Sequence, residues 1–300
     1  MRIHFGQREV ELGGKYLAAE LRDTRPEFDD ADALRKQLDD DGYLLLRGLH
    51  DRDLVLKARR AICEYLARCI DDENADLMDA VIKPGASKPK LNGQQVITHS
   101  QPLLAVLENK RLFSFFHTLF GTNATTFDYK WLRAIANGRS TGAHYDVVYM
   151  GRGSRQLCTC WTPLGDVNLD QGPLALCVGS HKLPGFEKLR ATYGRMDVDR
   201  DLVEGTFSND PVEIVDRFGG QWQTTNFRAG DVVIFGMFTM HASLTNTTHR
   251  WRISSDTRFQ PAQDAMDDRW VGEQPIKHYA SGKPGAKIVP IDKARADWGV

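Results

Sequence analysis

The strongest constraint on the fold is a succession of short β-prone runs between residues 125 and 260, separated by turns rich in Gly, Asn, Asp and Pro. The expected strands cover residues 125–136, 143–149, 156–163, 174–178, 222–227, 231–235 and 251–259. Many short strands divided by such turns are typical of a β-sandwich or jelly roll. The pattern therefore predicts a mainly β core.

Helical spacing dominates the residues before this core, from about 31 to 120. Apolar residues recur at helical intervals in 53–69, and the aromatic-rich segment 111–120 is followed by Gly121, a typical helix stop. The last residues, 262–300, are polar with few periodic apolar positions, so we expect them to wrap the surface. Because 300 residues can form one core, we expect a single domain over residues 1–300 with helices flanking the β core.

Composition narrows the classes of partner. The formal net charge of −1 provides no basic surface for nucleic acid or anionic membranes. No apolar run approaches the length of a membrane span, and the first residues contain no hydrophobic signal region. The five cysteines are odd in number and lie mostly in apolar segments, which indicates reduced thiols. We expect a cytoplasmic protein with neither nucleic acid nor a membrane as its partner.

A candidate metal site begins at His144 and Asp146, which are separated by one residue. In an extended strand, residues i and i+2 point to the same side, so both could bind one ion. Such a pair is common by chance, but His241 adds a third ligand after the strand-like run 231–240. Two imidazoles and one carboxylate can occupy one face of an octahedral metal and leave the other face open, as in non-haem Fe(II) sites.

Arg252 extends this site. It follows His241 by eleven residues, across a polar turn and at the start of another strand-like run, so a hairpin would place the two side by side. A buried guanidinium beside a metal requires an anion, and its planar fork suits a carboxylate. The sequence therefore indicates a dicarboxylate co-substrate that chelates the metal at one end and pairs with Arg252 at the other.

Four segments carry a resemblance to a known family. They are 41–48 (DGYLLLRG), 143–146 (AHYD), 161–181 with its acidic turn and final GSH turn, and 230–252 with His241 and Arg252. From about residue 34 to 261 the chain resembles the phytanoyl-CoA dioxygenase family of Fe(II)- and 2-oxoglutarate-dependent oxygenases. Val178 departs from the family, which usually has proline there, but this affects a turn and leaves the metal site unchanged.

The resemblance implies a double-stranded β-helix, the cupin-like jelly roll, over residues 125–260. It implies Fe(II), O₂ and 2-oxoglutarate at His144, Asp146 and His241, with ascorbate as an accessory reductant. Hydroxylation of an unactivated C–H bond in a small-molecule substrate, with release of succinate and CO₂, is the expected reaction. Halogenating relatives lack the carboxylate that Asp146 supplies here.

Other contacts to the co-substrate are expected from position. By the resemblance, Ser243 assists Arg252 with the far carboxylate, and Arg133 stands where the family often has a basic contact. Lys130 lies three residues earlier, at odd strand spacing, and should face the opposite way. Trp161 should pack beside the site as a large aromatic on the next strand, and Thr159, on the same face, should reach the co-substrate.

Two other functions remain open at this point. One is a catalytically silent metal-binding or regulatory β-helix domain, and the other is a cupin-like metal isomerase or hydrolase that does not use 2-oxoglutarate. The second leaves Arg252 and Ser243 unexplained. The long connection 182–221 is expected to be either a lid over the substrate or a surface excursion without a role. His181, Cys158 and Cys160 are expected to be structural or, for the cysteines, pocket-lining.

Overall fold

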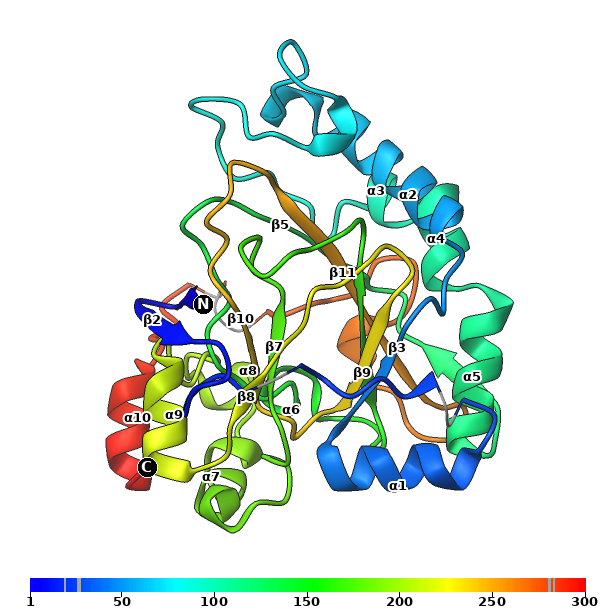
Figure 1. Ribbon diagram of the computed structural model, residues 1–300. Coiled ribbons are helices and arrows are strands. Elements are labelled where there is room, and N and C mark those ends of the chain that lie inside the picture. Colours follow the sequence, from blue (N-terminus) through cyan, green and yellow to red (C-terminus); the bar gives the residue numbers. More distant parts are fainter. Residues whose placement is uncertain (19, 26–27, 280–281, 283) are drawn as a thin grey trace.

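Two antiparallel β-sheets form the centre of the computed structural model, which describes residues 1–18, 20–25, 28–279, 282 and 284–300 (Figure 1). The larger sheet contains, in spatial order, β3 (Tyr43–Leu46), β9 (Val232–Gly236), β6 (Cys158–Pro163), β11 (Arg252–Pro261) and β4 (Ala124–Thr126), with β5 (Trp131–Ile135) also paired to β11. The smaller sheet has the order β10 (His241–Ser243), β7 (Leu174–Cys177) and β8 (Trp222–Gln223), and a separate hairpin joins β1 (Arg2–Phe5) to β2 (Arg8–Glu11).

The two sheets bury their inner faces against each other. Leu45, Trp161 and Phe235 of the larger sheet form one apolar cluster with Leu174 and Leu176 of β7. Since side chains alternate along a strand, the neighbouring residues of the larger sheet point the other way, toward the helices. This arrangement confirms the predicted mainly β fold with a jelly-roll core.

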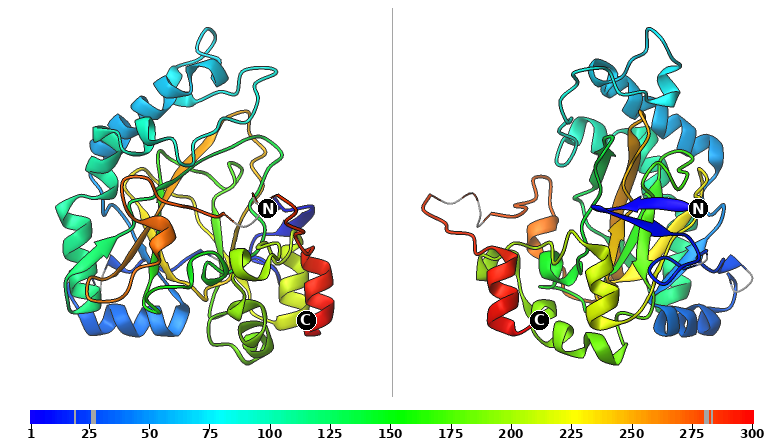
Figure 2. Two further views of the ribbon diagram at one scale, coloured as in Figure 1. Left: turned by 180° about the vertical axis from the view of Figure 1, so that it is seen from behind. Right: turned by 60° about the vertical axis from the view of Figure 1, so that its left-hand side comes forward.

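Helices surround the sheets. They are α1 (Ala31–Asp41), α2 (Arg52–Tyr65), α3 (Gln95–Thr98), α4 (Gln101–Leu107), α5 (Lys110–Phe120), α6 (Val147–Met150), α7 (Glu187–Ala191), α8 (Val198–Asp201), α9 (Pro211–Phe218) and α10 (Ile291–Trp298). Figure 2 shows α1 to α5 along one side of the molecule and α9 and α10 along the other. Among the described residues, no helix has both the length and the apolar composition needed to cross a membrane.

The outer face of the larger sheet is covered by α1 and α5. Leu34 and Phe116 from these helices pack on Cys160 and Phe259, and the rings of Phe116 and Phe259 stack with centroids 4.1 Å apart. The helix α5 ends at Gly121, whose φ of 71° is left-handed, as the sequence predicts. All five cysteines are free, and Cys158 and Cys160 belong to this outer core.

Several expected strands differ from the structure. The run 125–136 is divided into β4 and β5, and only residues 222–223 of the run 222–227 form a strand. The run 143–149 was expected as a strand, but Asp146 has helical backbone angles (φ −68°, ψ −27°) and begins α6. The i, i+2 argument for His144 and Asp146 was therefore wrong in its geometry, because the chain turns into a helix at the carboxylate.

The connection 182–221 is a folded part of the core. It contains α7, α8 and α9 and two short 3₁₀ turns, and it buries Phe186, Leu189, Tyr193 and Phe207 in the main apolar cluster. A deletion of residues 197–211 would therefore remove core side chains such as Phe207, and it could not test a lid role by itself. That this segment acts as a lid stays a prediction, as does one domain over residues 1–300.

Candidate metal centre

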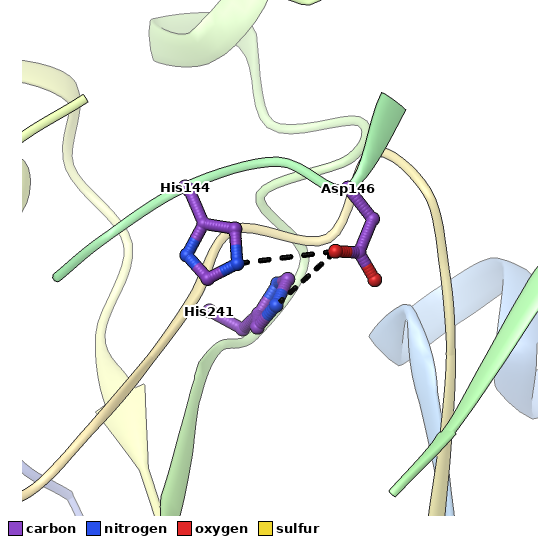
Figure 3. Close-up of side chains that lie close together, drawn as sticks. All are labelled: His144, Asp146 and His241. Atoms are coloured by element: carbon purple, nitrogen blue, oxygen red, sulfur yellow. Dashed lines mark ion pairs between the residues drawn. The ribbon is translucent and has the colours of Figure 1, made fainter. Parts of the chain in front are cut away.

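Three side chains from two separate segments converge on one point (Figure 3). The Nε2 atoms of His144 and His241 each lie 3.8 Å from Oδ1 of Asp146. All three residues are buried, and their ligand atoms lie within 4.8 Å of one another. The three residues chosen from the sequence therefore do come together, with one donor atom each facing a common centre.

Backbone carbonyls determine which nitrogen of each imidazole faces that centre. Nδ1 of His144 lies 2.8 Å from the carbonyl oxygen of Gly142, and Nδ1 of His241 lies 3.0 Å from that of Thr239. A carbonyl can only accept, so each Nδ1 carries the proton and each Nε2 keeps a free lone pair. The rings are thus oriented and protonated as metal ligands require.

Asp146 is held through its second oxygen. The Thr159 hydroxyl donates to Oδ2, and Nη2 of Arg258 lies 3.2 Å from the same atom. Oδ1 is left facing the histidines. Two donors on one oxygen orient the carboxylate so that a single oxygen points at the candidate metal position.

The electrostatics agree with metal binding. Burial, followed by the nearby His241, lowers the pKa of His144 to about 3, and burial also lowers the pKa of His241. Burial alone would raise the pKa of Asp146, but Arg258 and the two histidines outweigh it and hold that pKa below its usual value. At neutral pH the set is two neutral imidazoles and one carboxylate, which are the protonation states of ligands.

One small cavity, of about 30 Å³, is lined by this group and by every other predicted contact. Its lining includes all eight residues selected from the sequence: Arg133, His144, Asp146, Thr159, Trp161, His241, Ser243 and Arg252. Lys130 faces elsewhere, as expected, with its ammonium against Glu108.

The prediction of a hairpin between His241 and Arg252 is wrong. β10 pairs with β7 in the smaller sheet, whereas β11 pairs with β5 and β6 in the larger one. His241 and Arg252 reach the same cavity from two different sheets. The turn between them crosses from one sheet to the other. From the sequence spacing alone, such a crossing cannot be distinguished from a hairpin.

Arg252 is a buried cation, only 2% exposed. Its Nη1 donates to the Ser254 hydroxyl, and its Nε has no partner among the described residues. Burial, together with nearby Arg133, lowers its pKa to about 10, which still leaves it protonated at neutral pH. No carboxylate in the described part of the chain forms an ion pair with it, so its position favours an anionic ligand.

Ser243 and Arg133 lie in the same cavity as Arg252. The Ser243 hydroxyl accepts from the Thr141 amide at 2.8 Å, which leaves its own hydrogen free to donate. Nε of Arg133 lies 2.8 Å from Oδ2 of Asp256. Arg258 pairs with Asp146, so Arg252 is the cavity arginine without a carboxylate partner among the described residues.

Sequence reasoning missed two charged residues of the site. Asp256 and Arg258 share the inward face of β11 with Arg252, and both line the cavity. The alternation of polar residues at 252, 254, 256 and 258 was a usable signal, because a run of buried polar side chains on one face of a strand is uncommon without partners.

The residues fit the groups that the family resemblance implies. Two imidazole nitrogens and one carboxylate oxygen suit an Fe(II) site with open positions. The buried Nε of Arg252 without a partner fits a carboxylate ligand. A second and larger cavity, which includes Arg155 and Phe238, shares no lining residue with the metal cavity.

Comparison with known proteins identifies the family. The family model described as phytanoyl-CoA dioxygenase (PhyH) matches residues 38–254. The chain belongs to this family. The protein is accordingly an enzyme, an oxidoreductase of the Fe(II)- and 2-oxoglutarate-dependent dioxygenase class.

Two relatives are hydroxylases. The 1-deoxypentalenic acid 11-beta-hydroxylase of Streptomyces exfoliatus is 29% identical over 255 residues, which cover 80% of this chain and 84% of that protein. The protein of the same name from Streptomyces arenae is 25% identical over 257 residues, with 81% and 86% covered.

Solved structures share the fold. EctD from S. alaskensis in its apoform is 20% identical, with 86% of this chain and 87% of that chain covered and a TM-score of 0.55. The epimerase SnoN in complex with Fe³⁺, alpha ketoglutarate and nogalamycin RO is 18% identical, with 83% and 94% covered and a TM-score of 0.53. At these identities the likeness concerns the jelly-roll architecture.

Proposed function

We propose that His144, Asp146 and His241 hold Fe(II), and that Arg252 and Ser243 hold the far carboxylate of 2-oxoglutarate. The enzyme would then hydroxylate an unactivated C–H bond of a small-molecule substrate and release succinate and CO₂. One observation carries this proposal. Three possible metal-ligand atoms share a cavity with the buried guanidinium of Arg252, which no carboxylate of the described residues neutralises.

The protein residues have separate tasks in this scheme. When bound, iron and 2-oxoglutarate supply the activation of O₂ and the oxidising power. Gly142 and Thr239 keep each imidazole in the tautomer that presents Nε2. Thr159 and Arg258 keep Asp146 turned so that Oδ1 is its ligand atom.

The residues that line the cavity would orient the co-substrate and exclude water from it. Arg252 and Ser243 would fix one end of the co-substrate, while Arg133 and Trp161 border its length. Leu174 and Phe235 supply apolar surface on two other strands and exclude water. A dry, preorganised site strengthens each of these polar contacts.

The substrate proposed is a small molecule, and the two hydroxylases similar to this chain are named for acting on 1-deoxypentalenic acid. Oxidation of iron during uncoupled turnover would make ascorbate a useful reductant. The formal net charge of −1 supports a small molecule over nucleic acid or an anionic membrane surface as the partner.

Anaerobic titration followed by an oxygen pulse tests the proposal. The metal-free protein should bind one Fe(II) and then one 2-oxoglutarate, and oxygen should yield succinate. A silent metal-binding domain would bind iron but form no succinate. A cupin-like isomerase or hydrolase would bind metal and show no dependence on 2-oxoglutarate, and either result would refute the proposed function.

A further inference from the structure

Arg258 has a donor that nothing in the described protein uses. It is 2% exposed and lies on the inward face of β11, opposite Thr159 of β6. Its Nη2 lies 3.2 Å from Oδ2 of Asp146, and its guanidinium sits 4.5 Å from the centroid of the Trp131 ring. Nε approaches the Met150 sulfur at 2.9 Å, while Nη1 is buried without a partner among the described residues.

A buried N–H without a partner is rare in folded proteins and indicates a missing ligand or water. The ion pair with Asp146 and the contact with the Trp131 ring hold the guanidinium of Arg258 in place beside the cavity. The remaining donor, Nη1, belongs to a side chain that lines the cavity itself. Its position is therefore that of a preorganised hydrogen-bond donor next to the metal-binding carboxylate.

Arg258 is distinct from the proposed co-substrate anchor. Arg252 and Arg258 are six residues apart on one extended strand, so their Cα atoms are separated by about 20 Å. Arg252 lies opposite Ile135 of β5, at the end of β11 away from Thr159. The two arginines therefore enter the cavity from different levels, and Arg258 enters beside Asp146.

The charges of the cavity point to an additional anion. Its lining contains three arginines, Arg133, Arg252 and Arg258, against two carboxylates, Asp146 and Asp256. The charges of Fe(II) and of the 2-oxoglutarate dianion would cancel each other, so the cavity with both bound would keep one net positive charge. An uncompensated charge in a buried site is unfavourable, and one monoanion would neutralise it.

We propose that Arg258 binds an acidic group, a single carboxylate, on the primary substrate and so selects organic acids over neutral molecules. This inference rests on the proposed function, because the charge count includes iron and 2-oxoglutarate. A carboxylate fits better than a phosphate monoester, since a dianion would leave the cavity negatively charged. The contact would also place the substrate beside the metal centre, where Arg258 already touches Asp146.

A matched pair of ligands tests the inference by binding alone. The protein is loaded with Ni(II), which should be redox-inactive, and with 2-oxoglutarate. It is then titrated calorimetrically with benzoate and, separately, with benzamide. The two ligands have the same shape and differ in charge. Benzoate should bind saturably and at least about tenfold more tightly than benzamide, the difference expected for a charge-assisted hydrogen bond. Equal affinities, or no saturable benzoate binding, would overturn the inference.

Variants locate the effect. Arg258→Gln removes the charge, so at saturating Ni(II) and 2-oxoglutarate it should bring benzoate binding to the level of benzamide. Because Arg258 also supports Asp146, the Ni(II) affinity of the variant is measured alongside. Arg155→Gln is the control, because Arg155 also lies over an aromatic ring, that of Phe238 at 5.2 Å, but lines the other cavity. Loss of benzoate preference in the control as well would refute the assignment to Arg258.

The main rival is that Nη1 binds the metal-proximal carboxylate of 2-oxoglutarate. In that case Arg258→Gln weakens 2-oxoglutarate binding and the wild type does not discriminate benzoate from benzamide, which refutes the inference. Should Arg258→Gln fail to fold, the wild-type comparison of the two ligands still decides. Failure of Ni(II) or 2-oxoglutarate to bind the wild type would instead refute the proposed function.

Discussion

His144 and His241 are hydrogen-bonded to each other through both backbone amides. The amide of His144 donates to the carbonyl of His241 at 3.0 Å, and the amide of His241 donates back at 3.1 Å. This isolated antiparallel bridge joins two segments that are ninety-seven residues apart in the chain. It brings the two imidazoles within 4.1 Å of each other, measured between ring centroids, so the bridge positions both side chains of the candidate metal site.

The first prediction concerns these two ligands. His144→Ala or His241→Ala should abolish stoichiometric Fe(II) binding and all succinate formation, because two remaining ligands cannot hold a labile ion in fixed geometry. Anaerobic titration with Fe(II) measures the effect. His249→Ala removes an exposed histidine from the turn after β10 and should bind iron normally. A His144 or His241 variant with wild-type activity would show that the site is misassigned.

The second prediction concerns the co-substrate. Arg252→Lys keeps the charge but loses the planar fork, so the KM for 2-oxoglutarate should rise at least about tenfold while Fe(II) affinity stays unchanged. Steady-state succinate formation at varied 2-oxoglutarate measures it. Arg250→Lys changes an exposed arginine two residues earlier and is the matched control. An unaltered KM in Arg252→Lys would remove the reason for assigning the far carboxylate to this residue.

The third prediction concerns the second oxygen of Asp146. Thr159→Val replaces the donating hydroxyl by a methyl group of similar size, so the carboxylate loses one of its two supports. Metal affinity should fall roughly 10- to 100-fold, as is usual when a partner of a metal ligand is removed. Thr159→Ser, which keeps the hydroxyl, should retain most of the affinity. Equal Fe(II) affinity in all three proteins would contradict a supporting role for this hydroxyl.

The fourth prediction concerns pH and stability. His50 is buried; burial, with Arg111 nearby, lowers its pKa to about 4. In the unfolded chain an ordinary histidine has a pKa of about 6.5, so below that value the unfolded state binds a proton that the folded state does not. Stability should therefore be unaffected by this group above pH 6.5 and fall as the pH drops toward 4, by up to about 3 kcal/mol.

Urea unfolding of the metal-free protein at a series of pH values measures this fall. His50→Gln cannot titrate, so its unfolding free energy should decline less steeply than that of the wild type between pH 6.5 and 4. The other buried histidines, His144 and His241, contribute equally to both proteins, and the difference isolates His50. Parallel curves for the two proteins would show that His50 is not held neutral in the fold.

Much of the site could be predicted from the sequence because ligand chemistry is a local property. Histidine and aspartate at 144 and 146, histidine at 241 and arginine at 252 specify the donor types wherever the backbone places them. The two-residue alternation of a strand also places Arg252, Asp256 and Arg258 on one face of β11 without any knowledge of the fold. Gly121 likewise ends α5 through its own backbone freedom.

Only the tertiary structure decided how these groups meet. After β10 the chain crosses to the other sheet and forms no hairpin, so His241 and Arg252 line one cavity from two different sheets. Which arginine lacks a carboxylate partner, and which oxygen of Asp146 faces the histidines, depend on contacts between residues far apart in the chain. Such contacts result from the packing of two sheets against each other, and no short-range pattern in the sequence encodes that packing.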